Sequence, residues 1–81
     1  MNMGRPKIAI VDANTLVVLG LKQLLQNVMP IMTVDSFSSF QEFEKAQPNS
    51  YYHYFVSQVI VLENRQFFSQ CIHKTIVLTI T

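Results

Sequence analysis

Short apolar runs alternate with amphipathic segments along the chain. Residues 7–13 (KIAIVDA) place apolar residues next to one another, the pattern of a strand that is buried on both faces of a parallel sheet. In residues 15–28, leucines and valines recur at spacings close to one helical face, and Asn14 or Thr15 offers a side-chain oxygen to cap the helix. Pro30 prevents this helix from continuing. The first third of the chain therefore predicts a central strand followed by a helix.

The middle of the chain repeats this alternation. Residues 31–37 (IMTVDSF) are short and β-prone, and we expect an outer strand there. In residues 38–42 (SSFQE), a serine followed three residues later by glutamine or glutamate resembles a capping box, which predicts a brief helix that ends before Pro48. Residues 48–50 (PNS) are a turn or loop signal.

The last third of the chain begins and ends with apolar β-prone runs. Aromatic and β-branched residues predict a strand at about residues 52–57, and residues 74–81 (KTIVLTIT) form another continuous β-branched strand. Residues 59–71 leave two alternatives, a short helix that includes Phe67 and Phe68 or a longer strand. The alternation predicts an α/β fold, an open parallel sheet with right-handed crossovers and helices on both faces.

The length and composition of the chain limit it to one core. Its 81 residues are fewer than the usual ~100–150 of a domain, so we expect residues 7–81 to form a single domain after a flexible start or cloning remnant at residues 1–6. Hydrophobic residues make up 49% and charged residues 14%, against roughly 25% charged in an average soluble domain. A chain this small and this apolar should leave an uncovered face that a partner or a missing segment would fill.

Charge and hydropathy indicate where the chain acts. The six Lys and Arg residues are scattered and the formal net charge is +1, so the clustered cations that direct nucleic-acid binding requires are missing. No apolar run reaches 18 residues and no signal-peptide pattern opens the chain. We therefore expect a cytoplasmic protein with no membrane contact.

The reactive residue types do not form a recognisable catalytic or metal motif. Cys71 is the only cysteine, which excludes a disulfide framework and favours a half-buried free thiol. His53 and His73 have no Cys, Asp or Glu at ligand spacing, so zinc is not expected. Gly4 and Gly20 are too few for a glycine-rich phosphate loop.

The aromatic group before the third strand has two interpretations. Its members could stack on a ligand, but core packing is the expected role of Phe55, and two of the tyrosines are candidates for a surface patch that binds a partner. The group consists of Tyr51, Tyr52, Tyr54 and Phe55.

Two segments carry a family resemblance. Residues 10–25 (IVDANTLVVLGLKQLL) resemble the opening of a bacterial response-regulator receiver domain, whose first strand ends in two acidic residues and leads into a helix with a glycine, here Gly20. Asp12 matches the first acidic position. Residues 74–81 resemble the fourth strand of that family, which finishes with a hydroxyl residue, here Thr79. The resemblance implies a flavodoxin-like topology that is incomplete, with four strands and without the fifth strand and the last helices.

The departures from the receiver pattern affect its chemistry. In that family, two acidic residues and a phosphoacceptor aspartate hold Mg²⁺, because a hard cation needs several carboxylate oxygens. Here the second acidic position is Ala13, and Ser57 stands at the acceptor position with Gln58 beside it. A single carboxylate, Asp12, does not hold Mg²⁺ strongly, and no base is evident to activate the serine. We therefore expect no cofactor, no Mg²⁺ binding and no phosphorylation.

These features predict a regulatory module that works by association. The last strand would be an uncapped apolar edge, with Ile76, Leu78 and Ile80 as candidate contact residues, and such edges recruit another strand or another chain. We expect a homodimer, including one with exchanged elements. The resemblance further implies an upstream signalling protein as partner and contact with DNA only indirectly, through an absent C-terminal domain of a transcription regulator. The chain would then be a shortened regulator or its front part.

Two other functions stay open at this point. One is a receiver that accepts phosphate at a displaced acid, Asp35 or Glu63, although Asp35 lies on or near the second strand, away from the usual acceptor. The other is a small doubly wound enzyme that uses Asp12 with Ser57 or Thr79 as polar groups at the strand ends. The structural interpretation of Asp12 is a capping or loop-fixing carboxylate, and that of Ser57 is a hydroxyl bonded to backbone.

Overall fold

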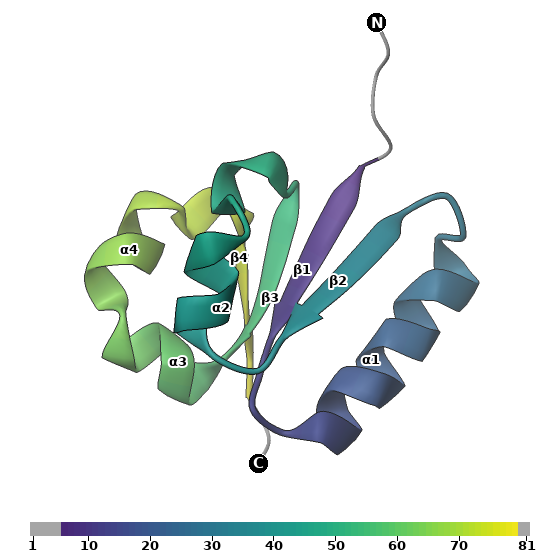
Figure 1. The fold of residues 1–81 in the computed structure, drawn as a ribbon, viewed down its shortest axis with the longest axis horizontal. Helices are drawn as coiled ribbons and strands as arrows, with labels where there is room; N and C mark the ends of the chain where they lie inside the picture. The colour runs from purple at the N-terminus through teal and green to yellow at the C-terminus, as the bar shows by residue number, and fades with distance from the viewer. Residues whose placement is uncertain (1–5, 80–81) are drawn as a thin grey trace, which may run out of the picture.

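The computed structural model describes residues 6–79. Its strands and helices follow one another in the alternating order that the sequence predicts (Figure 1). The strands are β1 (Lys7–Val11), β2 (Thr33–Phe37), β3 (His53–Ser57) and β4 (Thr75–Leu78). The helices are α1 (Thr15–Val28), α2 (Phe40–Lys45), α3 (Gln58–Glu63) and α4 (Arg65–Gln70), with 3₁₀ turns at Pro48–Ser50 and Ile72–Lys74.

The four strands form one parallel sheet in the order β2-β1-β3-β4. Helix α1 covers one face, and α2, α3 and α4 lie together on the other (Figure 1). The predicted α/β class, with an open parallel sheet and helices on both faces, is therefore confirmed. The strand order is compatible with the flavodoxin-like topology, with four strands among the described residues.

Each end of α1 is fixed by a local signal. The Asn14 side-chain oxygen accepts hydrogen bonds from the backbone amides of Leu16 (3.0 Å) and Val17 (3.3 Å), so Asn14 is the cap and not Thr15. The helix ends at Val28, two residues before Pro30, and its bounds are those that the sequence predicts.

The predicted capping box is also present at α2. The Ser39 hydroxyl accepts from the Glu42 amide at 3.2 Å. Glu42 reaches back to the backbone amide of Ser38 at 3.2 Å, one residue before the position that a regular capping box uses.

Several strand bounds are shorter than predicted. β1 stops at Val11 and not at residue 13, because the Asp12 carboxylate binds the Asn14 amide and turns the chain. β2 begins at Thr33 because Met32 still belongs to a turn, in which its amide donates to the Met29 carbonyl. β4 spans only Thr75–Leu78, and the rest of the predicted strand includes Ile80, which lies outside the described residues.

Residues 59–71 are helical, so the alternative of a longer strand is wrong. The segment forms two short helices that are interrupted at Asn64. The Asn64 side-chain amide donates to the Ile60 carbonyl at 2.9 Å, and the Asn64 backbone amide shares the same acceptor. This local competition for a helical carbonyl ends α3 after Glu63.

The predicted start of the chain lies largely beyond what the structure shows. Residues 1–5 are outside the described residues. The carbonyl of Pro6 accepts a hydrogen bond from the Thr33 amide at 3.0 Å and thus continues the pairing of β1 with β2.

The two faces of the sheet carry separate apolar clusters. On the α1 face, Ile8 and Ile10 of β1 pack with Leu25 of α1 and Val34 of β2. On the other face, a cluster that includes seven aromatic rings is centred on Phe43, which is fully buried. Successive residues of β1 alternate between the two clusters, so this strand is buried on both faces as predicted.

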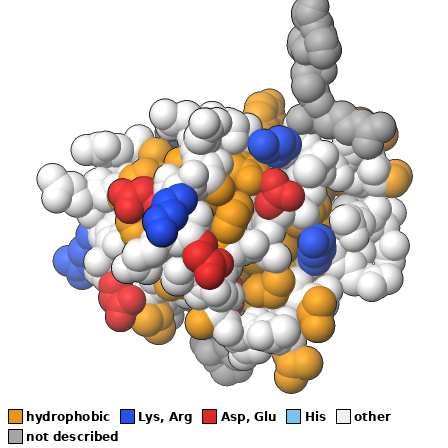
Figure 2. All heavy atoms as spheres, in the orientation of Figure 1, with side chains coloured by type: hydrophobic (Ala, Val, Ile, Leu, Met, Phe, Trp, Pro, Cys, Tyr) orange, Lys and Arg blue, Asp and Glu red, His pale blue; other side chains and the backbone are white. Residues whose placement is uncertain are grey.

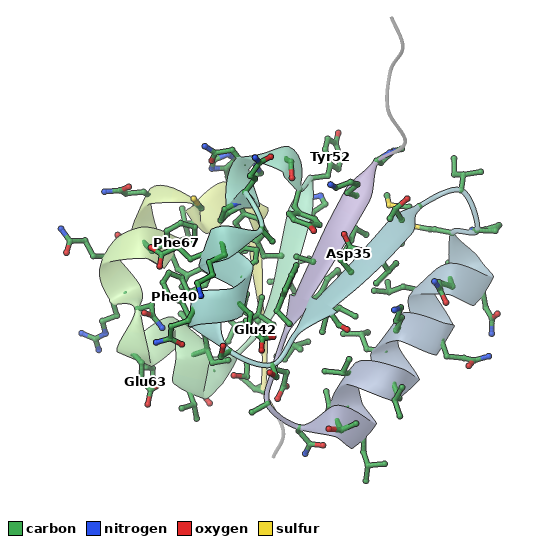
Figure 3. All side chains as sticks on the ribbon, viewed as in Figure 1. Asp35, Phe40, Glu42, Tyr52, Glu63 and Phe67 are labelled. Atoms are coloured by element: carbon green, nitrogen blue, oxygen red, sulfur yellow. The ribbon has the colours of Figure 1, made fainter. Side chains whose placement is uncertain are left out.

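The surface is uneven in charge. Figure 2 shows most of the visible charged side chains on the side of α2, α3 and α4, whereas hydrophobic side chains stand out at the amino-terminal end of α1. Figure 3 shows Phe40 and Phe67 turned toward each other between α2 and α4, with a ring-centroid separation of 5.2 Å. Helices therefore cover the aromatic side of the sheet, and their charged side chains point to solvent.

The tyrosines depart from the sequence prediction. Only Tyr52 is exposed, and Figure 3 shows it projecting from the top of the sheet. Tyr51 and Tyr54 are buried, because each hydroxyl has an acceptor: the Asp35 carboxylate at 2.6 Å for Tyr51 and the Pro48 carbonyl at 2.8 Å for Tyr54. The predicted patch of two surface tyrosines is thus wrong, and Phe55 is less buried than Tyr54.

Alkaline pH should destabilise the fold through these two phenols. Burial, reinforced by the hydrogen bond to Asp35, raises the pKa of Tyr51. Burial, reinforced by the electrostatic effect of the Cys71 side chain, raises the pKa of Tyr54 from 10.0 to about 12. As the pH rises above 10, the unfolded chain loses these protons first. The free energy of unfolding in urea should therefore be level below this pH and fall above it, by up to about 1.4 kcal/mol per pH unit for each phenol.

The variant Tyr54→Phe gives the control for this pH dependence. It loses the titrating group but keeps the ring in the aromatic cluster, so the fall in stability between pH 10 and about 12 should be shallower than in the parent chain. Equal slopes for parent and variant would show that Tyr54 does not contribute.

Candidate functional site

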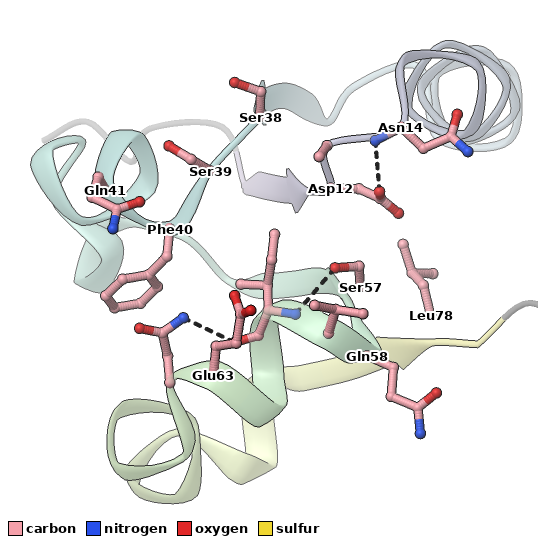
Figure 4. Close-up of a pocket in the computed structure, with 14 residues that line it drawn as sticks. Asp12, Asn14, Ser38, Ser39, Phe40, Gln41, Ser57, Gln58, Glu63 and Leu78 are labelled. Atoms are coloured by element: carbon pink, nitrogen blue, oxygen red, sulfur yellow. Dashed lines mark hydrogen bonds between the residues drawn. The ribbon is translucent and has the colours of Figure 1, made fainter.

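A cleft of about 720 Å³ lies at the carboxyl ends of the strands. Its walls come from the β1–α1 loop, the start of α2 and the whole β3–α3 turn, and Leu78 contributes the end of β4 (Figure 4). Open α/β sheets bind ligands at this edge, so it is the first place to look for chemistry. Asp12, Ala13 and Ser57, which sequence reasoning singled out, all line this one cleft.

Asp12 fixes the loop that leads into α1. Its carboxylate accepts a hydrogen bond from the Asn14 amide at 2.8 Å, and Asn14 in turn caps the helix (Figure 4). Only 8% of Asp12 is exposed. The loop-fixing role proposed as the structural interpretation of Asp12 is therefore what the hydrogen bonds show.

Ser57 is the cap of α3. Its hydroxyl oxygen accepts from the Ile60 amide at 3.3 Å, and its backbone is extended, as is usual for the residue before a helix (Figure 4). This is the backbone-bonded serine that the sequence favours. Among the described residues, the Ser57 hydroxyl has no bond to a side chain that could act as a base.

The residues of the cleft do not fit the Mg²⁺ site of a receiver. Such a site needs several carboxylate oxygens directed at one point, but here the position after Asp12 is an alanine and the position at the end of β3 is a capping serine. Glu63 lines the same cleft from the far end of α3, as a largely solvated side chain. Within residues 6–79, no group of three or more His, Cys, Asp or Glu side chains is placed to hold a metal.

Thr79 and Asp35 lie outside this cleft. Thr79 follows β4 directly and is exposed, and Leu78 is the β4 residue that lines the cleft. Asp35 is on β2, where its carboxylate accepts from Tyr51. Neither residue therefore joins Asp12 and Ser57 in a polar group.

Sequence reasoning missed the neutral polar wall of the cleft. Ser38, Ser39 and Gln41 line it from the start of α2, and Gln58 and Asn64 line it from the two ends of α3. A signal was present, because residues that cap helices after parallel strands must meet at the carboxyl edge of the sheet. The cleft is thus built mainly from hydrogen-bonding groups without charge.

The two histidines lie at the opposite edge of the sheet and line the same cleft. His53 and His73 line a second cleft, of about 520 Å³, together with Lys7 and Lys74. Their proximity was not visible in the sequence, because twenty residues separate them. The described lining of the second cleft holds these two imidazoles and two lysines, with no Cys, Asp or Glu.

Cys71 is a free, half-buried thiol, as predicted. It follows α4 directly and packs against the aromatic cluster. Its thiol therefore packs as a small side chain beside the Tyr54 phenol, whose pKa it helps to raise.

Comparisons with protein-family models, with curated proteins and with solved structures gave no match for this chain. None of the helices within residues 6–79 combines the length and the apolar character that crossing a bilayer requires.

Replacing Ser57 should cost stability and thereby show its structural role. In Ser57→Ala, the Ile60 amide loses its acceptor, and the free energy of unfolding should fall by about 1 kcal/mol. The matched control is Ser69→Ala, since that hydroxyl is exposed in α4 and donates to the Gln66 carbonyl; its effect should stay within about 0.5 kcal/mol. Urea unfolding measures both, and equal stability of Ser57→Ala and the parent would contradict the capping role.

Proposed function

We propose that this chain is a receiver-like regulatory module of a bacterial transcription regulator, and that it acts in the cytoplasm by binding protein chains and not by phosphoryl transfer. The strand order β2-β1-β3-β4 supports the resemblance, as does the position of Asp12 at the end of β1. The position of Ser57 at the end of β3 also supports the resemblance, which assigns the phosphoacceptor position to this residue. The resemblance extends the proposal to an upstream signalling protein and to DNA contact through a further domain.

One observation carries the association part of the proposal: within residues 6–79, no helix lies over half of one sheet face. Helix α1 packs on β1 and β2, while α2, α3 and α4 all lie on the other side of the sheet (Figure 1). On the α1 side, Phe55 of β3 is therefore only half-buried, and its register partner Ile76 on β4 is 41% exposed. Parallel sheets are normally covered on both faces, and this exposed half of the α1 side therefore supports binding of a protein partner.

The hydrogen bonds of the cleft support the part of the proposal that excludes phosphoryl transfer. Both side chains that the receiver pattern would use, Asp12 and Ser57, accept backbone amides of their own loops. An acceptor displaced to Asp35 is disfavoured by its bond to Tyr51. Glu63 lines the cleft and is therefore the alternative phosphoacceptor that an experiment must address.

Incubation with acetyl phosphate and Mg²⁺ tests the proposal directly. Intact-mass spectrometry should show no added phosphoryl group on the parent chain, because the described part of the chain holds no receiver-like carboxylate cluster to bind the metal and to accept the phosphate. An added phosphoryl mass that is lost in Glu63→Gln would overturn the proposal in favour of the displaced acceptor. A phosphoryl mass retained in that variant would overturn it equally, with the acceptor elsewhere.

A gain-of-function variant tests the receiver-like geometry itself. Ala13→Asp and Ser57→Asp together would add two carboxylates to the cleft that Asp12 lines. The double variant should bind Mg²⁺, measured by calorimetry, whereas the parent and a control with Ala13→Asn and Ser57→Asn should not. Circular dichroism shows whether the double variant folds. A folded double variant that does not bind Mg²⁺ would show that the cleft does not have the receiver arrangement.

A further inference from the structure

Asp12 is the only charged side chain that is buried within residues 6–79, with an exposed fraction of 8%. Its one hydrogen bond in this part of the chain comes from the Asn14 amide and uses Oδ1. The second carboxylate oxygen, Oδ2, has no such partner, and it is not enclosed by the protein, since only His53 Nδ1 is both enclosed and unpaired among the described side chains. Figure 4 shows this free oxygen turned away from Asn14, on the side of the cleft.

No positively charged side chain within residues 6–79 lines the cleft with this carboxylate. The lining contains no Lys, Arg or His. A second hollow beside Asp12, which Glu42 also lines, contains none either. Buried aspartates are almost always paired, because removing an ion from water without a counter-charge is costly. The described residues therefore leave Asp12 without the counter-charge that its burial requires.

The second acid of the cleft is distant from Asp12. Asp12 lies beside Ser57, the cap of α3, because Val11 and Val56 that precede these two residues are register partners. Glu63 is at the other end of α3, which with 6 residues is about 9 Å long. Figure 4 shows the two acids on opposite sides of the cleft. One metal ion cannot bind both carboxylates at this separation, whereas two positive charges on one extended molecule can.

The rest of the lining suits an aliphatic molecule with polar ends. Phe40, Val59 and Ile60 contribute apolar surface, against which a chain of methylene groups can pack. Gln41 and Gln58 contribute amide oxygens, which can accept the protons of an ammonium group.

An anionic ligand fits this cleft poorly. The amino ends of α1, α2 and α3 face it, and free helix amides favour anions. Here, however, Asn14, Ser39 and Ser57 already accept amides from the first turns of these helices. An anion would in addition meet Asp12 and Glu63 without a cation among the described lining residues.

We propose that the cleft binds a linear aliphatic diamine, with one ammonium group against Asp12 and the other near Glu63. The formal net charge of the whole chain is +1, so a diamine is not attracted to the protein in general and its binding depends on the local acids. In the regulatory module proposed above, the diamine is the signal. That role rests on the proposed function, whereas the binding itself rests on the cleft.

Titration calorimetry of the full 81-residue chain at physiological ionic strength tests the binding with four probes of equal chain length. Diaminobutane should bind with one molecule per chain. Butylamine should bind more weakly by up to about fivefold, because it lacks only the solvated pair with Glu63. Butanediol should bind at least tenfold more weakly, because it supplies no charge to Asp12, and succinate should not bind.

Three variants assign the binding to the two acids. Asp12→Asn should lower the affinity for diaminobutane at least tenfold, because it removes the charge while its amide oxygen can still accept from the Asn14 amide. Glu63→Gln should lower that affinity by up to about fivefold and leave butylamine binding unchanged. The matched control is Glu44→Gln, an exposed position of α2 outside the cleft lining, which should change neither affinity.

Thermal unfolding separates a ligand-binding charge from a structural one. Without ligand, Asp12→Asn should unfold at the same temperature as the parent or higher, because it removes a buried charge that has no counter-charge. Diaminobutane should raise the midpoint of the parent and not that of the variant. A lower midpoint for the ligand-free variant would show that the charge serves the loop, and would overturn the inference.

The probes and variants also give the other outcomes that would overturn the inference. These are no binding of diaminobutane, equal binding of butanediol and diaminobutane, and equal affinity of the parent and Asp12→Asn. A chain that accepts no phosphoryl group from acetyl phosphate and binds no diamine loses this inference and keeps the proposed function. A chain that binds the diamine at Asp12 and is phosphorylated does the reverse.

Discussion

The fold depends on the burial of β1 from both sides. This strand pairs with β2 on one edge and with β3 on the other, and Ile8, Ala9, Ile10 and Val11 are each at most 2% exposed. A strand of this kind is stable only if helices cover both faces of the sheet around it. Helix α1 covers one face and α2 with its neighbours covers the other, and β1 contributes two buried residues to each of the two apolar clusters.

The parts of the fold that local chemistry determines were predictable. The unbroken apolar run of β1, the Asn14 cap and the serine before α2 each specify an element without information from the rest of the chain, and all three are present. The helical conformation of residues 59–71 was not predictable, because their apolar pattern suits a strand as well as a helix. In the structure, Ile60 and Phe68 of these helices pack in the aromatic cluster, and such tertiary contacts are not encoded in the local pattern.

The candidate site was predictable to a similar degree. Strand ends in a parallel sheet converge, so the placement of Asp12, Ala13 and Ser57 around one cleft followed from the order of the elements. Two other groupings depend on how far the chain turns between elements, which no local pattern encodes. These are the bond between Tyr51 and Asp35, sixteen residues apart, and the placement of His53 and His73 around one cleft. The burial of the two tyrosines was missed for the same reason, since their hydroxyl acceptors are distant in sequence or lie in a turn.

The position of β4 has a consequence for the motions of the molecule. Among the described strands it is paired on one side only, with β3, and half of its residues are exposed. Local opening can therefore release β4 while both apolar clusters around β1 stay intact, and amide hydrogen exchange would proceed faster there than in the centre of the sheet. The edge that is open to other chains is thus also the part of the sheet that can most readily rearrange to receive one.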